Sequence, residues 1–276
     1  MNNQNHVTII RAKEGWQPID WGELWHYKDL MYFLIIRNIE TRYAQSVLGI
    51  GWAIVRPMFS MIIFSIVFGK LAKINSDGVP YAIFSYTALV PWTYFSGALS
   101  SSSNSLLSSV GMMTKVYFPR LIIPLTPIIS LLVDFVIAFI ILLFLMTYYE
   151  FYPNSQILYL PILIILMMLT ASGLGMWFTA LAIQYRDVKH AISFIVQILM
   201  YLAPVVYPAS NVPEKFRLLY GCFPMAGVIE GFRSILLDTN PMPWDLVSMG
   251  FLASILLFVS GVLYFRKMEK YFVDVA

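Results

Sequence analysis

The chain has 276 residues, of which 59% are hydrophobic and 12% charged, and its mean hydropathy is +0.73. Soluble proteins carry about 25% charged residues, so this composition excludes a water-soluble domain and predicts that lipid surrounds most of the chain. The formal net charge of +3 comes with basic residues scattered between apolar blocks, which argues against a nucleic-acid partner, because such a partner requires a basic patch.

The amino-terminal end shows two successive patterns. Residues 1–20 are polar and mixed in charge, without the apolar stretch of a signal peptide, and we expect a cytoplasmic tail. Residues 21–46 are apolar on one side and charged on the other, which predicts an amphipathic helix in the headgroup layer, with an ordinary soluble helix as the alternative. The polar and aromatic residues of interest on this interface helix are Lys28, Arg37, Glu40, Arg42 and Tyr43.

The rest of the chain reads as an all-α integral membrane domain over residues 47–276. Six apolar blocks each approach the roughly 20 residues needed to cross a bilayer, and we place them at 52–70, 81–109, 121–148, 157–183, 191–207 and 246–265. The fifth block is short, and Pro204 and Pro208 are expected to turn its end into an irregular or re-entrant segment.

Six crossings put both termini on one side of the membrane, and the positive charges indicate which side. With the amino terminus inside, 13 of the 18 Lys and Arg residues fall on cytoplasmic stretches and 5 on outer ones. Lys and Arg near membrane ends are retained in the cytoplasm, so we predict that both termini are cytoplasmic.

Two spans contain unusually polar positions. Serines crowd the second span between Ser100 and Ser109; they either permit close helix packing, the interpretation we prefer, or line a wet path. Asp134 lies some thirteen residues into the third span, near mid-membrane at about 1.5 Å per residue. A buried acid there can act as a proton relay or ion ligand, but without a second acid or histidine nearby we favour a hydrogen-bonded residue that fixes helix packing.

Catalytic and metal-binding patterns are missing from the sequence. The phosphate-binding G-x-x-x-x-G-K-[ST] loop is absent, since Gly69-Lys70 is followed by Leu71, and there is no G-x-S-x-G or H-E-x-x-H. The single cysteine, Cys222, leaves no disulfide or zinc cluster. We therefore expect no enzyme activity, metal or cofactor in this chain.

A short loop at residues 113–120 is basic and aromatic. Such a loop suits docking against another protein, although the same residue types also decorate membrane interfaces without any partner.

Several motifs occur in a characteristic order: R-x-x-x-x-R-Y-x-x-S-x-L-G-x-x-W from Arg37 to Trp52, then K-V-Y-F-P-R, Y-R-D-V, P-E-K-F-R and G-V-I-E-G-F-R. Over residues 21–270 the chain resembles an ABC-2 type permease of polysaccharide export, most closely those for O-antigen, capsule and teichoic acid chains. The resemblance implies a homodimer in the bacterial inner membrane that encloses a channel for a lipid-linked polysaccharide. Two copies of a separate cytoplasmic ATPase would bind ATP and Mg and drive it.

The same resemblance implies roles for particular residues. The helix that couples to the ATPase would comprise Lys115, Val116, Tyr117, Phe118, Pro119 and Arg120, with a second contact at Tyr185, Arg186 and Asp187. Residues 211–238 would form short gate helices that carry Pro213, Glu214, Arg217, Pro224, Glu230 and Arg233. The family often has Asn-Pro before the second gate helix, whereas Phe223 precedes Pro224 here, so a gate hydrogen bond from that position is not expected.

Sugar rings stack on aromatic faces, which suggests a channel lining for such a cargo. Our candidates are Tyr86, Trp92, Tyr94, Phe95 and Ser101. Alternative functions are an exporter of a drug or small lipid in the same superfamily, or an ATPase-independent channel or intramembrane enzyme.

Overall fold

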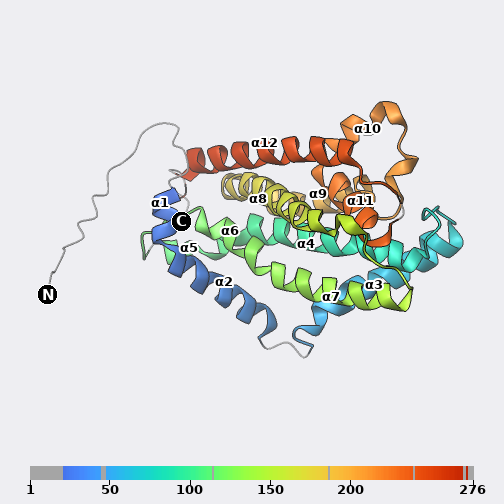
Figure 1. The fold of residues 1–276 in the computed structure, drawn as a ribbon. Coiled ribbons are helices and arrows are strands. Elements are labelled where there is room, and N and C mark those ends of the chain that lie inside the picture. The colour runs from blue at the N-terminus through green and yellow to red at the C-terminus, as the bar shows by residue number, and fades with distance from the viewer. Residues whose placement is uncertain are drawn as a thin grey trace.

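The computed structural model describes residues 21–44, 48–113, 115–185, 187–238, 240–269 and 272, and every element in these ranges is helical (Figure 1). The predicted tail at 1–20, the last two residues of the predicted interface helix and Arg186 lie outside them. The elements in chain order are α1 Trp21–His26, α2 Lys28–Tyr43, α3 Gly51–Phe64, η1 Ser65–Leu71, α4 Tyr81–Ser108, α5 Val110–Met113, α6 Ile122–Ser130, α7 Leu132–Tyr148, η2 Ser155–Tyr159, α8 Leu160–Gln184, α9 Val188–Leu202, η3 Ala209–Asn211, α10 Glu214–Gly221, α11 Pro224–Leu237 and α12 Trp244–Met268.

Four helical segments are long and apolar enough to cross a membrane. They are Gly51–Leu71, Ile122–Tyr148, Ser155–Gln184 and Trp244–Met268, and they coincide with the first, third, fourth and sixth predicted spans. The second predicted span is the 28-residue α4, which is not among these four apolar segments. The fifth is the 15-residue α9, shorter than the roughly 20 residues that a perpendicular crossing needs.

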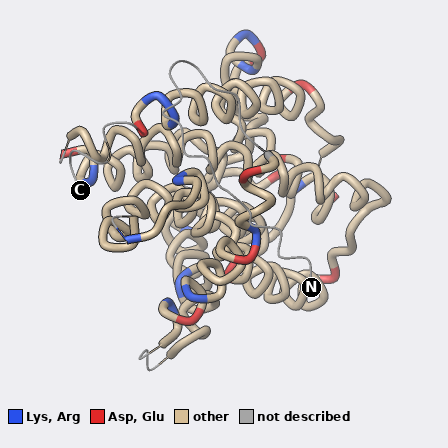
Figure 2. Tube along the Cα trace, turned by 90° about the vertical axis from the view of Figure 1, so that its left-hand side faces the viewer, with Lys and Arg blue, Asp and Glu red and all other residues tan. Residues whose placement is uncertain are grey.

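Helix α4 occupies the centre of the bundle, with α3, α6, α7, α8, α9 and α11 packed against it (Figure 1). Eighteen of its 28 residues are buried, so protein covers most of its surface. A helix in that position does not need the continuous apolar surface of a lipid-facing span, which explains how α4 accommodates its serines. Charged residues are sparse over the whole bundle, and Figure 2 shows that most of the tube is neither acidic nor basic.

The polar face of α4 packs closely against α6 and α8. The Ser102 hydroxyl donates to the Pro124 carbonyl at 2.9 Å, and the Thr179 hydroxyl donates to the Ser102 carbonyl at 2.8 Å. A Cβ atom added to Gly175 would lie 2.5 Å from Ser102 Oγ. On this face the packing interpretation of the serines is confirmed, because the hydroxyl replaces a larger side chain and bonds across the helix contact.

Helices α8 and α12 make the closest contact between long helices. A Cβ atom on Gly173 would lie 2.5 Å from the Leu257 carbonyl carbon, and one on Gly261 would lie 2.4 Å from the Gly173 oxygen. Beside this contact, Trp177 stacks on Tyr264 with ring centroids 4.2 Å apart and donates from Nε1 to Ser260 Oγ at 3.1 Å. Small residues allow backbones to approach in this way in a bilayer.

The segment after α9 breaks as the prolines predict. Helix α9 ends at Leu202, two residues before Pro204, and residues 203–208 have no regular structure although most of them are buried. Two short helices follow, the largely exposed α10 and the fully buried α11. Both lie at the end of the bundle opposite α1 (Figure 1).

Candidate functional site

A cavity of about 390 Å³ lies between α2, α4 and α6, and its wall combines polar side chains with the apolar Leu34, Met112, Ile123 and Pro127. Helix α2 contributes Arg37, Asn38, Thr41 and Arg42 to its wall. Opposite them, α4 and its carboxyl end contribute Ser101, Ser105, Ser108 and Ser109, and α6 contributes Thr126. Cavities of this size hold small molecules or parts of larger ones. The serine-rich stretch therefore has two roles, since Ser102 packs against other helices while its neighbours face this cavity.

Asp134 fastens the end of α2 to the start of α7. Arg42 Nη1 donates to Asp134 Oδ2 at 3.1 Å, and the Tyr43 hydroxyl donates to Asp134 Oδ1. With these partners and a side chain that is 25% exposed, Asp134 is neither alone nor fully buried. Its bonds to Arg42 and Tyr43 agree with the favoured interpretation, a hydrogen-bonded residue that fixes helix packing. Its charge is compensated because Arg42 neutralises it and Tyr43 donates to its other oxygen.

The same contact favours the neutral form of Tyr43. Burial of the hydroxyl, and then its hydrogen bond to Asp134, raise the pKa of Tyr43 above its ordinary value. The phenol therefore remains a donor to the carboxylate at every physiological pH. The other polar residues predicted on this helix, Lys28 and Glu40, are exposed.

The predicted coupling loop divides into an exposed half and an anchored half. Lys115, Val116 and Tyr117 are exposed, whereas Phe118 and Pro119 are buried. Arg120 Nη1 donates to the Glu269 carbonyl at 2.6 Å, just past the end of α12. The anchored half thus fixes the exposed half at the surface between α5 and α6.

Tyr117 is also tied to the amino-terminal helix. Its hydroxyl donates to Glu23 Oε1 of α1 at 3.3 Å, while 57% of the residue is exposed. Burial, and then the neighbouring Glu23 carboxylate, raise the pKa of Tyr117. Tyr185 and Asp187, on the next predicted contact, are exposed as well.

The predicted gate residues fall into an outer and an inner group. Pro213 and Glu214 are exposed at the start of α10, and Arg217 is ion-paired with Asp245 at the start of α12. Pro224 opens α11, where its missing N–H costs nothing. The ring of Phe223, the residue before it, packs edge-to-face against Phe95, with the ring centroids 6.4 Å apart.

The inner group holds the broken segment together. Arg233 is 1% exposed and donates to three backbone carbonyls: Nη2 to Val205 at 3.0 Å, Nη1 to Tyr207 at 3.3 Å and Nε to Phe84 at 3.4 Å. Glu230 Oε1 accepts from Arg233 Nη1 at 2.9 Å and from the Ala209 N–H at 2.9 Å. Irregular backbone away from water requires such internal partners, and these two side chains supply them.

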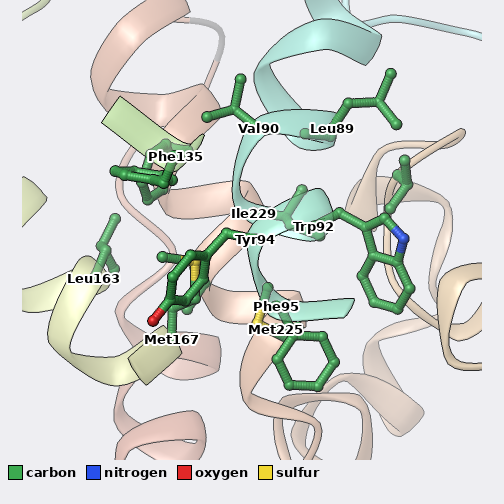
Figure 3. Packing of buried hydrophobic residues seen from close by; sticks show 14 of the residues in the cluster. Leu89, Val90, Trp92, Tyr94, Phe95, Phe135, Leu163, Met167, Met225 and Ile229 are labelled. Atoms are coloured by element: carbon green, nitrogen blue, oxygen red, sulfur yellow. The ribbon is translucent and has the colours of Figure 1, made fainter. Parts of the chain in front are cut away.

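Four of the five predicted channel residues do not face an opening. Tyr86, Trp92, Tyr94 and Phe95 are at most 4% exposed. Figure 3 shows the last three among residues of the buried core, such as Phe135. They pack within one chain, because α4 is central rather than peripheral. Ser101, the fifth, lines the cavity between α2, α4 and α6.

Sequence reasoning missed the two ion pairs that organise the polar residues. Arg42 and Asp134 are 92 positions apart, and nothing in either local pattern indicates the other. The pairing of Glu230 with Arg233 was within reach, since residues three apart on a helix share a face and a charged pair in an apolar helix signals a partner.

Comparisons with known proteins agree with this architecture. The profile of the ABC-2 type transporter family matches residues 29–237. The O-antigen export system permease protein RfbA of Myxococcus xanthus is 23% identical over 252 residues, covering 90% of this chain and 96% of that protein, and RfbA of Klebsiella pneumoniae is 23% identical with 90% and 95% covered. The polysialic acid transport protein KpsM of Escherichia coli is 24% identical, with 86% and 92% covered. This chain belongs to the ABC-2 type transporter family.

Proposed function

We propose that this chain is the membrane-spanning permease subunit of an ABC exporter that moves a lipid-linked polysaccharide, such as O-antigen, across the bacterial inner membrane. The observation that carries the proposal is the near full-length similarity to permeases named for O-antigen and polysialic acid transport. A relative in Neisseria meningitidis is named for capsule polysaccharide export and is 21% identical. ATP and Mg would bind to a separate ATPase, since this chain has no phosphate-binding loop.

The proposed topology has six crossings with cytoplasmic termini. Besides the four apolar spans, α4 would cross the membrane inside the bundle. Helix α9 would also cross, and the irregular segment 203–208 would cover the part of the bilayer that α9 is too short to span. Helices α10 and α11 would then form the gate on the outer side. The predominance of Lys and Arg on the inner stretches supports this orientation.

Two copies of the chain would form the channel, and two ATPase subunits would sit beneath it. Within the apolar span Gly51–Leu71, only 11% of an 18-residue stretch is buried within one chain, which leaves ample surface for a second copy and for lipid. The ATPase would dock on Lys115, Val116 and Tyr117 and on the exposed Tyr185 and Asp187, with α2 alongside.

A reconstituted system tests the proposal. The chain and its cassette ATPase would be placed in proteoliposomes with a lipid-linked glycan, and ATP-dependent transfer of the glycan to the opposite leaflet would be measured. We expect transfer only when both proteins, ATP and Mg are present. Transfer by this chain alone, or stimulation of the ATPase by drugs but not by the glycan lipid, would contradict the proposal.

The docking role is tested by Tyr117→Ala. Removing a central aromatic side chain from an interface typically costs about 2 kcal/mol or more, so ATP-driven export is expected to fall at least about tenfold while the amount of protein in the membrane stays the same. Tyr152→Ala is the matched control, because Tyr152 is 72% exposed on the connection between α7 and η2. Equal export in the two variants would remove the docking assignment.

A further inference from the structure

We infer that the cavity between α2, α4 and α6 binds the phosphate or pyrophosphate group of a lipid, and that Arg37 is its principal ligand. The inference rests on the proposed function for the identity of the lipid, the carrier that holds the glycan. Its physical basis is independent of that function, because it lies in the charge and hydrogen-bonding capacity of the cavity wall.

The wall is basic. Two guanidinium groups line it, Arg37 and Arg42, and no carboxylate is among the described residues that do so. Arg42 is partly neutralised by Asp134, but the Arg37 side chain has no hydrogen-bond or ion-pair partner in the described part of the chain. Guanidinium groups bind phosphate oxygens through paired N–H donors, so the free charge of Arg37 favours an anion.

The hydroxyl groups of the wall sort into donors and acceptors. Those of Thr41, Ser105, Ser108 and Thr126 already donate to backbone carbonyls, at distances from 2.5 to 2.8 Å. Ser101 and Ser109 make no side-chain hydrogen bond to another described residue. A phosphate accepts but does not donate when ionised, so Ser101 and Ser109 can serve it directly. The other four hydroxyls still offer lone pairs, which suit the hydroxyls of an attached sugar.

The position of the cavity fits a lipid rather than a dissolved metabolite. One wall is α2, whose exposed aromatic side chains include Tyr32 at 67% and Phe33 at 60%. Aromatic and basic side chains of this kind are favoured at the boundary between headgroups and acyl chains. A phosphate reaching the cavity from that boundary can keep its hydrocarbon tail in the bilayer.

Direct binding measurements test the site. The permease–ATPase complex would be held in phosphatidylcholine nanodiscs and titrated with a fluorescent short-chain polyprenyl pyrophosphate, with inorganic pyrophosphate as competitor. We expect Arg37→Gln to weaken binding about tenfold or more, since a charge-assisted contact is lost, and Arg37→Lys to lie between that variant and the wild type. The control is Arg56→Gln, which removes the same charge from an exposed residue outside the cavity wall and should change affinity less than about twofold.

The outcomes separate the site from its context. Unchanged binding in Arg37→Gln, an equal loss in Arg56→Gln, or equal binding of the polyprenyl alcohol without phosphate would overturn the site. Competition by phosphatidylglycerol through Arg37 would identify the membrane headgroup as the phosphate source, and its failure to compete would identify the carrier lipid. If Arg37-dependent binding holds but proteoliposomes export no glycan, the site stands and the proposed function fails. If the proteoliposomes export the glycan and Arg37→Gln binds the lipid normally, the proposed function stands and the site fails.

Discussion

Two of the arginine–carboxylate pairs among the described residues differ clearly in their access to solvent. Arg42 and Asp134 join α2 to α7, with side chains 30% and 25% exposed. Arg233 and Glu230 lie on α11, with side chains 1% and 9% exposed. The first pair borders a cavity, whereas the second is enclosed by backbone.

Exposure decides whether a pair can exchange partners. Water or an incoming anion can replace Asp134 at Arg42, since solvent screens the attraction and compensates for its loss. At Arg233 the partners are three carbonyls and Glu230, and no solvent is available to replace them. Loss of one partner therefore leaves buried groups uncompensated. The partly exposed pair, Arg42 with Asp134, is therefore suited to ligand exchange. The buried pair, Arg233 with Glu230, is suited to fixed structure. We call them the outer pair and the inner pair.

The largest expected effect follows from breaking the inner pair. Arg233→Met leaves the Glu230 charge with the Ala209 N–H alone and deprives the Val205 and Tyr207 carbonyls of their donor, so it should destabilise the chain by about 3–5 kcal/mol. The measurement is thermal unfolding in detergent, read by size-exclusion chromatography. Adding Glu230→Gln should recover part of the loss, because the stranded charge is removed. A single variant as stable as the wild type would show that the segment does not need these bonds.

Breaking the outer pair should cost less. Asp134→Asn removes the charge from a partly exposed pair, and we expect a loss of about 1 kcal/mol or less. The effect should be local, with faster hydrogen exchange in α2 near Arg42 and unchanged exchange in α11. Arg217→Gln is a matched comparison, since its pair with Asp245 is 40% and 37% exposed. A loss comparable to that of Arg233→Met would erase the distinction between the two pairs.

The smallest effect concerns pH. Burial raises the pKa of Glu269, against the opposing pull of Arg120 and Arg266. An acid whose folded-state pKa is raised binds its proton more tightly when folded, so its contribution to stability is present below the ordinary pKa of 4.5 and is lost as pH rises through the folded value. Glu269→Gln should remove this pH-dependent loss of folding stability. We expect the loss to be about 0.5 kcal/mol or less, because the Glu269 side chain is 36% exposed. The melting temperatures of the variant and the wild type would be measured across pH 4–8. A difference between them that does not change with pH would contradict this prediction.

The sequence was sufficient for the elements that depend on local pattern. Apolar length predicted six spans, and four of them coincide with helical segments long and apolar enough to cross a membrane. Pro204 predicted the break after α9. Side-chain environment was harder to predict, because it depends on which helix occupies the centre. Aromatic residues on α4 looked available to a cargo, yet α4 is covered on most sides. Likewise, the partner of Asp134 lies on a helix 92 residues away, and no periodicity encodes that distance.

The glycine contact between α8 and α12 bears on how the bundle can deform. At Gly173 and Gly261 the two backbones touch with no side chain between them. A change in the crossing angle of α8 and α12 therefore displaces fewer side chains at this point than a separation of the two helices would. We expect this point to behave as a fulcrum. Arg120 donates to the Glu269 carbonyl just past the end of α12. A small displacement of the 115–120 loop would therefore rotate α12 about the glycine contact. The opposite end of α12, beside α10 and α11, would then move in the opposite direction.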